Sequence, residues 1–114
     1  MIEKNNERIN IGSLCIELIK NKLKDDFVYG FIFGSSVEGT FSEESDIDII
    51  IVIKNSTKVD YKYYIDQCIS MVESDYIVLI DLYTCKEDKL DLEKQKIFIN
   101  DINLPIANMI KITA

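Results

Sequence analysis

The chain has 114 residues, of which 47% are hydrophobic and 29% are charged, and its formal net charge at pH 7 is −7. This composition is too apolar for a disordered chain and predicts one globular domain over residues 1–114. The acidic balance argues against a protein that wraps nucleic acid, because that mode of binding requires a concentrated basic surface. We therefore expect no direct nucleic-acid partner.

The sequence carries no sign of a membrane segment or of a metal site built on cysteine. The N-terminal stretch "MIEKNNERIN" has no apolar core of a signal peptide, and apolar runs such as 49–53 are far shorter than a membrane span. Cys15, Cys68 and Cys85 lie far apart in a chain without histidine. We expect a cytoplasmic protein with no membrane partner, and reduced thiols that are buried or inert.

In chain order, the first half predicts a helix, a strand, a short helical turn and a second strand. Apolar residues recur at helical spacing over 6–24. The aromatic and β-branched run "FVYGFIF" (27–33) ends at Gly34 and predicts a strand that is buried on both faces. The run "DIDIIIVI" (46–53) has the same character, with its polar residues only at its start.

The second half predicts a helix, a strand, a weaker helix and an edge strand. Apolar residues from Tyr61 to Val72 form an amphipathic stripe, which predicts that Tyr61 and Tyr64 pack in the core. A strand is predicted over 76–83 and a helix over 86–101. Because Pro105 lacks an N–H, a fourth strand at "INLPIAN" (102–108) would lie at a sheet edge. The order predicts an α/β fold with a small mixed sheet of three to four strands flanked by helices.

Three aspartates are predicted to gather at one end of this sheet. Asp46 and Asp48 share a face of their strand, with α-carbons roughly 7 Å apart. Asp81 interrupts the otherwise apolar "IVLIDLY". If the strand at 76–83 is antiparallel to the strand at 46–53, Asp81 reaches the edge where Asp46 begins. Grouped carboxylates are the ligands that Mg²⁺ prefers, so we expect a magnesium site there.

The glycine and serine after the first predicted strand have the properties of an anion-binding site. A strand that turns after Gly34 and Ser35 presents backbone N–H groups and a hydroxyl, which together can bind a polyphosphate. The alternative interpretation is purely local: Ser45 or Asp46 caps a turn, and backbone N–H groups satisfy Asp48. The combination of Gly34, Ser35 and three aspartates favours the functional interpretation.

The stretch "FGSSVEGTFSEESDIDIIIVI" resembles the signature of the polymerase-beta-like nucleotidyltransferases. In that family Gly-Ser is followed after ten residues by Asp-x-Asp and later by a third aspartate on a strand; here ten residues separate Ser35 from Asp46. The resemblance implies that Asp46 and Asp48 hold Mg²⁺ and that Asp81 is a third ligand or a general base. It also implies that Gly34 and Ser35 bind the triphosphate of ATP, and that Gly39 allows the tight turn.

The chain is most similar to the minimal nucleotidyltransferases, the antitoxins of HEPN-MNT toxin–antitoxin pairs. This resemblance implies transfer of AMP from ATP to a tyrosine of a HEPN toxin, which would silence the toxin. Two alternatives stay open. Ser36 and Glu38 stand where family members often carry arginine, which suggests a non-catalytic antitoxin that acts by binding alone. A small-molecule acceptor such as an antibiotic would require an acceptor pocket, which a homo-oligomer could supply.

Overall fold

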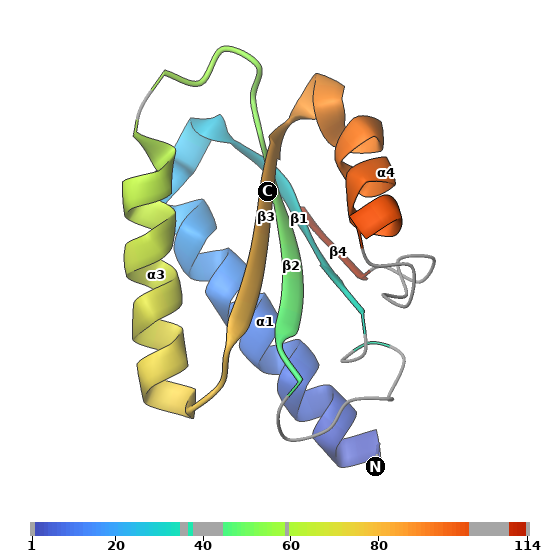
Figure 1. Ribbon diagram of the computed structural model, residues 1–114. Coiled ribbons are helices and arrows are strands. Elements are labelled where there is room, and N and C mark those ends of the chain that lie inside the picture. The colour runs from blue at the N-terminus through green and yellow to red at the C-terminus, as the bar shows by residue number, and fades with distance from the viewer. Residues whose placement is uncertain (1, 35–36, 38–44, 59, 101–109, 114) are drawn as a thin grey trace.

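A computed structural model of the chain describes residues 2–34, 37, 45–58, 60–100 and 110–113 (Figure 1). The elements along the chain are α1 (Ile2–Leu23), η1 (Lys24–Asp26), β1 (Phe27–Phe33), β2 (Ile47–Ile53), α3 (Tyr61–Tyr76), β3 (Ile80–Lys86), η2 (Glu87–Lys89), α4 (Leu90–Asn100) and β4 (Ile110–Thr113). The strands form one mixed sheet in the order β3-β2-β1-β4. The predicted α/β fold with a small mixed sheet is confirmed.

The pairing of β3 differs from the prediction. β1 is antiparallel to both β2 and β4, but β3 is parallel to β2. Parallel neighbours need a crossover connection, and helix α3 provides it. In Figure 1, α3 runs beside the sheet and returns the chain to the end where β2 begins.

The prediction also placed the third strand four residues too early. Residues 76–79 end helix α3 and lead into β3, so Tyr76 is helical and the strand begins at Ile80. Ile77 closes the helix in the left-handed conformation, with φ of 53°, and its N–H bonds to the carbonyl of Glu73. Periodicity cannot distinguish a short apolar run at a helix end from a strand, which explains the error.

The fourth strand lies further along the chain than predicted. The segment 102–108 falls outside the described residues, whereas β4 (Ile110–Thr113) pairs with β1 at the sheet edge. Among the described residues, no helix has both the length and the apolar run needed to cross a membrane.

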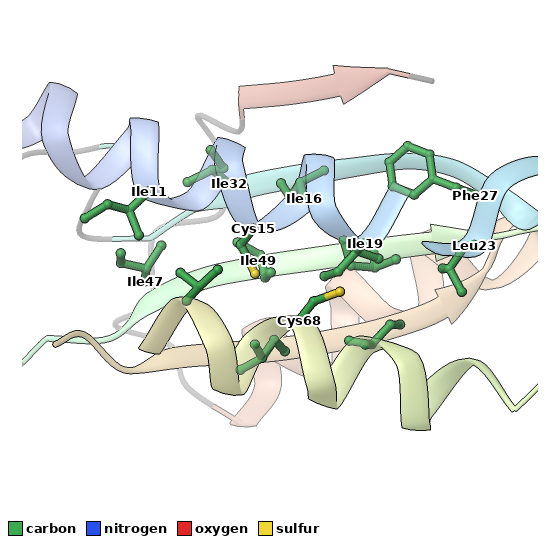
Figure 2. Packing of buried hydrophobic residues seen from close by; sticks show 14 of the residues in the cluster. Ile11, Cys15, Ile16, Ile19, Leu23, Phe27, Ile32, Ile47, Ile49 and Cys68 are labelled. Carbon is green, nitrogen blue, oxygen red and sulfur yellow. The ribbon is translucent and has the colours of Figure 1, made fainter. Parts of the chain in front are cut away.

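Alternating side chains of β2 reach two separate hydrophobic clusters. Ile47, Ile49, Ile51 and Ile53 pack with α1 and α3 on one face, as Figure 2 shows in part. Ile50 and Val52 belong to the other face, with Phe31 and Phe33 of β1. Every residue of β2 is buried. This explains why its sequence is almost continuously apolar rather than alternating.

The structure tests two further predictions, on the burial of the cysteines and on the packing of Tyr61 and Tyr64. Cys15 and Cys68 are buried free thiols and Cys85 is partly buried; burial raises the pKa of Cys15 to about 12, so this thiol is inert at neutral pH. Tyr61 packs against the core as expected. Tyr64 does not, because it is 39% exposed and its ring lies 5.6 Å from that of Tyr63, on the outer side of α3.

Helix α1 approaches the sheet closely at Gly30 of β1. A Cβ atom added to Gly30 would lie 2.8 Å from Cγ2 of Ile16, closer than real Cβ contacts. The absence of a side chain at this position therefore sets the distance between α1 and the sheet.

We predict that Gly30→Ala lowers the free energy of unfolding by about 1–3 kcal/mol, because Ile16 or the helix must move. Gly12→Ala is the matched control: its Cβ would lie 3.1 Å from the Cδ1 atom of Ile32, and alanine favours the helix by about 1 kcal/mol. Urea unfolding of both variants measures the difference. An unchanged unfolding midpoint for Gly30→Ala would contradict the close approach.

The connection between α3 and β3 is held by the side chain of Glu73. Its Oε2 atom accepts a hydrogen bond of 2.9 Å from the backbone N–H of Ile80, the first residue of β3. Its carbonyl also accepts from the N–H of Val78, at 3.4 Å. One residue thus ties the end of the crossover helix to the start of the strand.

We predict that Glu73→Ala destabilises the protein by about 1–3 kcal/mol, because the N–H of Ile80 loses its acceptor. Glu73→Gln retains an acceptor oxygen and should lose less. Asp75→Ala, which removes an exposed carboxylate of the same helix, should be close to neutral. Thermal unfolding of the three variants tests this order; equal losses in Glu73→Ala and Asp75→Ala would disprove it.

Candidate active site

The starts of β2 and β3 bring the predicted aspartates together. Because the two strands are parallel and in register, Asp48 lies directly opposite Asp81. On its other side Asp48 pairs with Phe33, the last residue of β1. Asp46 immediately precedes β2. Asp48 and Asp81 are therefore neighbours at one end of the sheet, through parallel rather than antiparallel pairing.

The aspartates of the two strands share one face of the sheet. Asp48 alternates with the isoleucines that contact α1 and α3, so it lies on the face of Ile50 and Val52. Asp81 lies on that face as well, because Tyr83, two residues further along β3, packs in the same cluster. Asp48 is only 5% exposed, while Asp46 and Asp81 are partly exposed. The acidic site thus contains one buried carboxylate and two that solvent can reach.

Gly34 makes the turn that follows β1. Its φ is 78°, in the left-handed region that favours glycine, and its carbonyl accepts a hydrogen bond of 3.1 Å from the N–H of Val37. The turn begins next to the pair formed by Phe33 and Asp48. Gly34 therefore directly follows the strand residue that pairs with Asp48. Ser35 and Gly39, the other predicted phosphate-binding residues, lie outside the described residues, as do Ser36 and Glu38.

A tyrosine hydroxyl contacts the carboxylate of Asp81. Tyr83 donates a hydrogen bond of 3.0 Å from its Oη atom to Oδ2 of Asp81. The ring of Tyr83 lies 5.8 Å from that of Phe33 across the sheet, which holds it in place. Tyr83 was not among the predicted site residues, although its position two residues after Asp81 on a strand already puts both on one face. The contact shows that Asp81 can accept a hydrogen bond from a phenol.

Arg8 of α1 is a second residue that sequence analysis missed. Its side chain is 9% exposed, and its Nη2 atom donates a hydrogen bond to the carbonyl of Ser45, directly before Asp46. Burial lowers the pKa of the Arg8 guanidinium, whereas the negative charges of Asp46 and Asp48 raise it. The available signal was that this is the chain's single arginine, within a helix that otherwise contributes its apolar face to the core.

Backbone contacts also hold the two strand starts together. The N–H of Ile47 donates a hydrogen bond of 2.9 Å to the carbonyl of Leu79, so the residues before β2 and β3 are joined just outside the sheet. Together with the contact between Glu73 and Ile80, this bond fixes the register that places Asp48 opposite Asp81. The carboxylates therefore stand on rigid elements rather than on loops.

The carboxylates have the chemistry of a magnesium site but do not complete one alone. Among the residues that the structure describes, no three histidine, cysteine or acidic side chains converge closely enough to hold a metal ion. Mg²⁺ commonly binds one or two carboxylates together with water and substrate phosphates. The neighbouring Asp48 and Asp81, with Asp46 before them, fit this mode of binding. The assignment of Asp46, Asp48 and Asp81 as ligands stays a prediction.

Comparison with known proteins agrees with this geometry. The chain is 37% identical over 57 residues to a Methanocaldococcus jannaschii protein named "Putative protein adenylyltransferase", an alignment that covers 50% of this chain and 53% of the relative. The chain thus matches about half the length of that relative. A crystal structure of a "putative nucleotidyltransferase" from Sulfolobus solfataricus superimposes with a TM-score of 0.60 at 22% identity, covering 80% of this chain and 78% of that one.

The family model described as "Nucleotidyltransferase domain" matches residues 16–102, which include β1, β2, β3 and all three aspartates. The matched part is well over half of the chain. The solved structure has the same fold, and the relative from M. jannaschii bears the name of an enzyme that transfers a nucleotide. The chain therefore belongs to the family of nucleotidyltransferase domains.

Proposed function

We propose that this protein transfers AMP from ATP to a tyrosine of a partner protein, a HEPN-type toxin, and thereby acts as its antitoxin. The observation that carries the proposal is the pairing of Asp48 with Asp81 beside the turn at Gly34. Two carboxylates next to a glycine turn suit a metal-bound triphosphate. The name of the M. jannaschii relative supports a protein as the acceptor.

In the proposed reaction, the tyrosine oxygen attacks the α-phosphorus of ATP. A new P–O bond forms, the bond between the α-phosphorus and the bridging oxygen breaks, and pyrophosphate leaves with the electron pair. Asp46 and Asp48 would hold Mg²⁺, which when bound neutralises charge on the phosphates. Asp81 would take the proton of the tyrosine hydroxyl, since its carboxylate already accepts a hydrogen bond from Tyr83.

The surface beside Asp81 supports a macromolecular acceptor. Three large hydrophobic side chains are exposed at the turn before β3: Tyr76 at 47%, Ile77 at 92% and Leu79 at 63%. Grouped exposed apolar residues are typical of protein-binding surfaces. This turn leads directly to the carboxylate that would receive the proton of the acceptor tyrosine.

Binding alone is the second candidate. The departures at Ser36 and Glu38 favour it, because a glutamate close to a triphosphate opposes nucleotide binding. A protein that acts by binding alone would silence its partner without ATP. The two candidates therefore differ in whether the partner gains mass.

We predict that Asp46→Asn and Asp48→Asn each reduce AMP transfer more than about a hundredfold while the protein stays folded, because each removes a charge that holds the metal. The measurement uses ATP labelled at the α-phosphate, Mg²⁺ and an extract of the source cells. Mass spectrometry then identifies the labelled protein and residue. The exposed Asp66→Asn on α3 is the control for the loss of one negative charge.

Label on a tyrosine of a HEPN protein that depends on Asp46 and Asp48 is the expected result. Label on a small molecule alone would reject the protein acceptor. Transfer at the wild-type rate in Asp48→Asn would reject the role of the carboxylates. If no label depends on the aspartates while the protein still inhibits its toxin, binding alone accounts for the antitoxin activity.

A further inference from the structure

The sequence between β1 and β2, which includes the Gly34 and Ser35 expected to bind the triphosphate, contains no positive charge of its own. Residues 34–46, between β1 and β2, include Glu38, Glu43, Glu44 and Asp46 but no lysine or arginine. A polyanion that approaches this loop meets like charges, which raise the free energy of binding. A site for ATP here therefore needs a cation from another element.

Arg8 is a cation from another element that the fold brings to the end of this segment, at Ser45. It lies toward the N-terminal end of α1, and Figure 1 shows that part of the helix near the start of β2. The hydrogen bond to the carbonyl of Ser45 fixes its guanidinium at the last residue of the acidic loop before Asp46. A charged side chain that is 9% exposed is costly to bury unless it has partners. The burial thus indicates a fixed position rather than a solvated surface charge.

We propose that Arg8 is a positioning residue that makes binding of the divalent metal depend on the triphosphate. The inference rests on the proposed function, because it assumes that Asp46 and Asp48 take the metal of a nucleotide complex. A fixed positive charge beside these carboxylates repels a bare divalent cation. The same charge attracts a triphosphate, and an arginine presents several N–H donors to its oxygens. Metal alone is disfavoured, and metal with nucleotide is favoured.

This arrangement has a signature that a merely structural arginine lacks. Loss of a structural contact weakens every ligand together, because the site becomes disordered. If Arg8 has the proposed role, loss of its charge changes the affinities for metal and for metal–nucleotide in opposite directions. The bare metal binds more tightly, and the metal–nucleotide complex binds more weakly.

The experiment titrates the protein with Mn²⁺ and measures the free ion by electron paramagnetic resonance. Each titration is made with and without an ATP analogue that carries a methylene group between the α- and β-phosphates. Because this analogue cannot react, the affinities are independent of activity. For Arg8→Gln we expect the affinity for Mn²⁺ alone to rise about three- to tenfold and the affinity for the Mn²⁺–analogue complex to fall by a similar factor. Arg8→Lys, which keeps the charge, should remain closer to the wild type for both ligands.

Lys22→Gln is the matched control, because it removes one exposed positive charge from the same helix about 21 Å further along. It should change neither affinity. If Arg8→Gln does not fold, Arg8→Met removes the same positive charge and replaces it with an apolar side chain that suits a buried position. Circular dichroism establishes the folded state of each variant.

Parallel weakening of both ligands by Arg8→Gln, or no change in either, would overturn the role of Arg8 while leaving the proposed function intact. If the wild-type protein binds no Mn²⁺ with the analogue, the nucleotidyl transfer itself is disproved, together with this inference. Opposite shifts in Arg8→Gln, absent from Lys22→Gln, are the result that supports the proposal.

Discussion

The parallel pairing of β2 with β3 is the constraint on which the site depends. Parallel neighbours run in the same direction, so their first residues meet at one edge of the sheet. In this protein those first residues include Asp48 and Asp81, which lie opposite each other. The crossover through α3 is the consequence, and the contacts of Glu73 and Leu79 at its end hold the two strand starts at matching height.

Helix α1 joins the hydrophobic core to the acidic edge. Its middle packs against β1, where Gly30 leaves room for Ile16, and its N-terminal part carries Arg8 to Ser45. One helix therefore makes both the contact with the core and the contact with the segment before β2.

Burial gives the three aspartates different environments. Asp48 stands in a strand whose residues are all buried, whereas Asp46 and Asp81 are partly exposed at the strand starts. A buried carboxylate requires a compensating positive charge, and the charges of Asp46 and Asp48 act on the guanidinium of Arg8. The hydroxyl of Tyr83 contacts Asp81 from the same face. The three carboxylates therefore differ in their exposure and in their contacts.

The sequence by itself determined the elements whose patterns are local: β1 over 27–33, β2 within one residue, the α/β class and the family. These follow from side-chain periodicity and from the spacing of Gly34, Asp46 and Asp48. Only the tertiary structure decided that β3 begins at Ile80 and runs parallel to β2, since the hydrophobic pattern of a strand carries no direction. It also decided that Arg8 meets the acidic loop, because two segments 37 residues apart are brought together by packing alone.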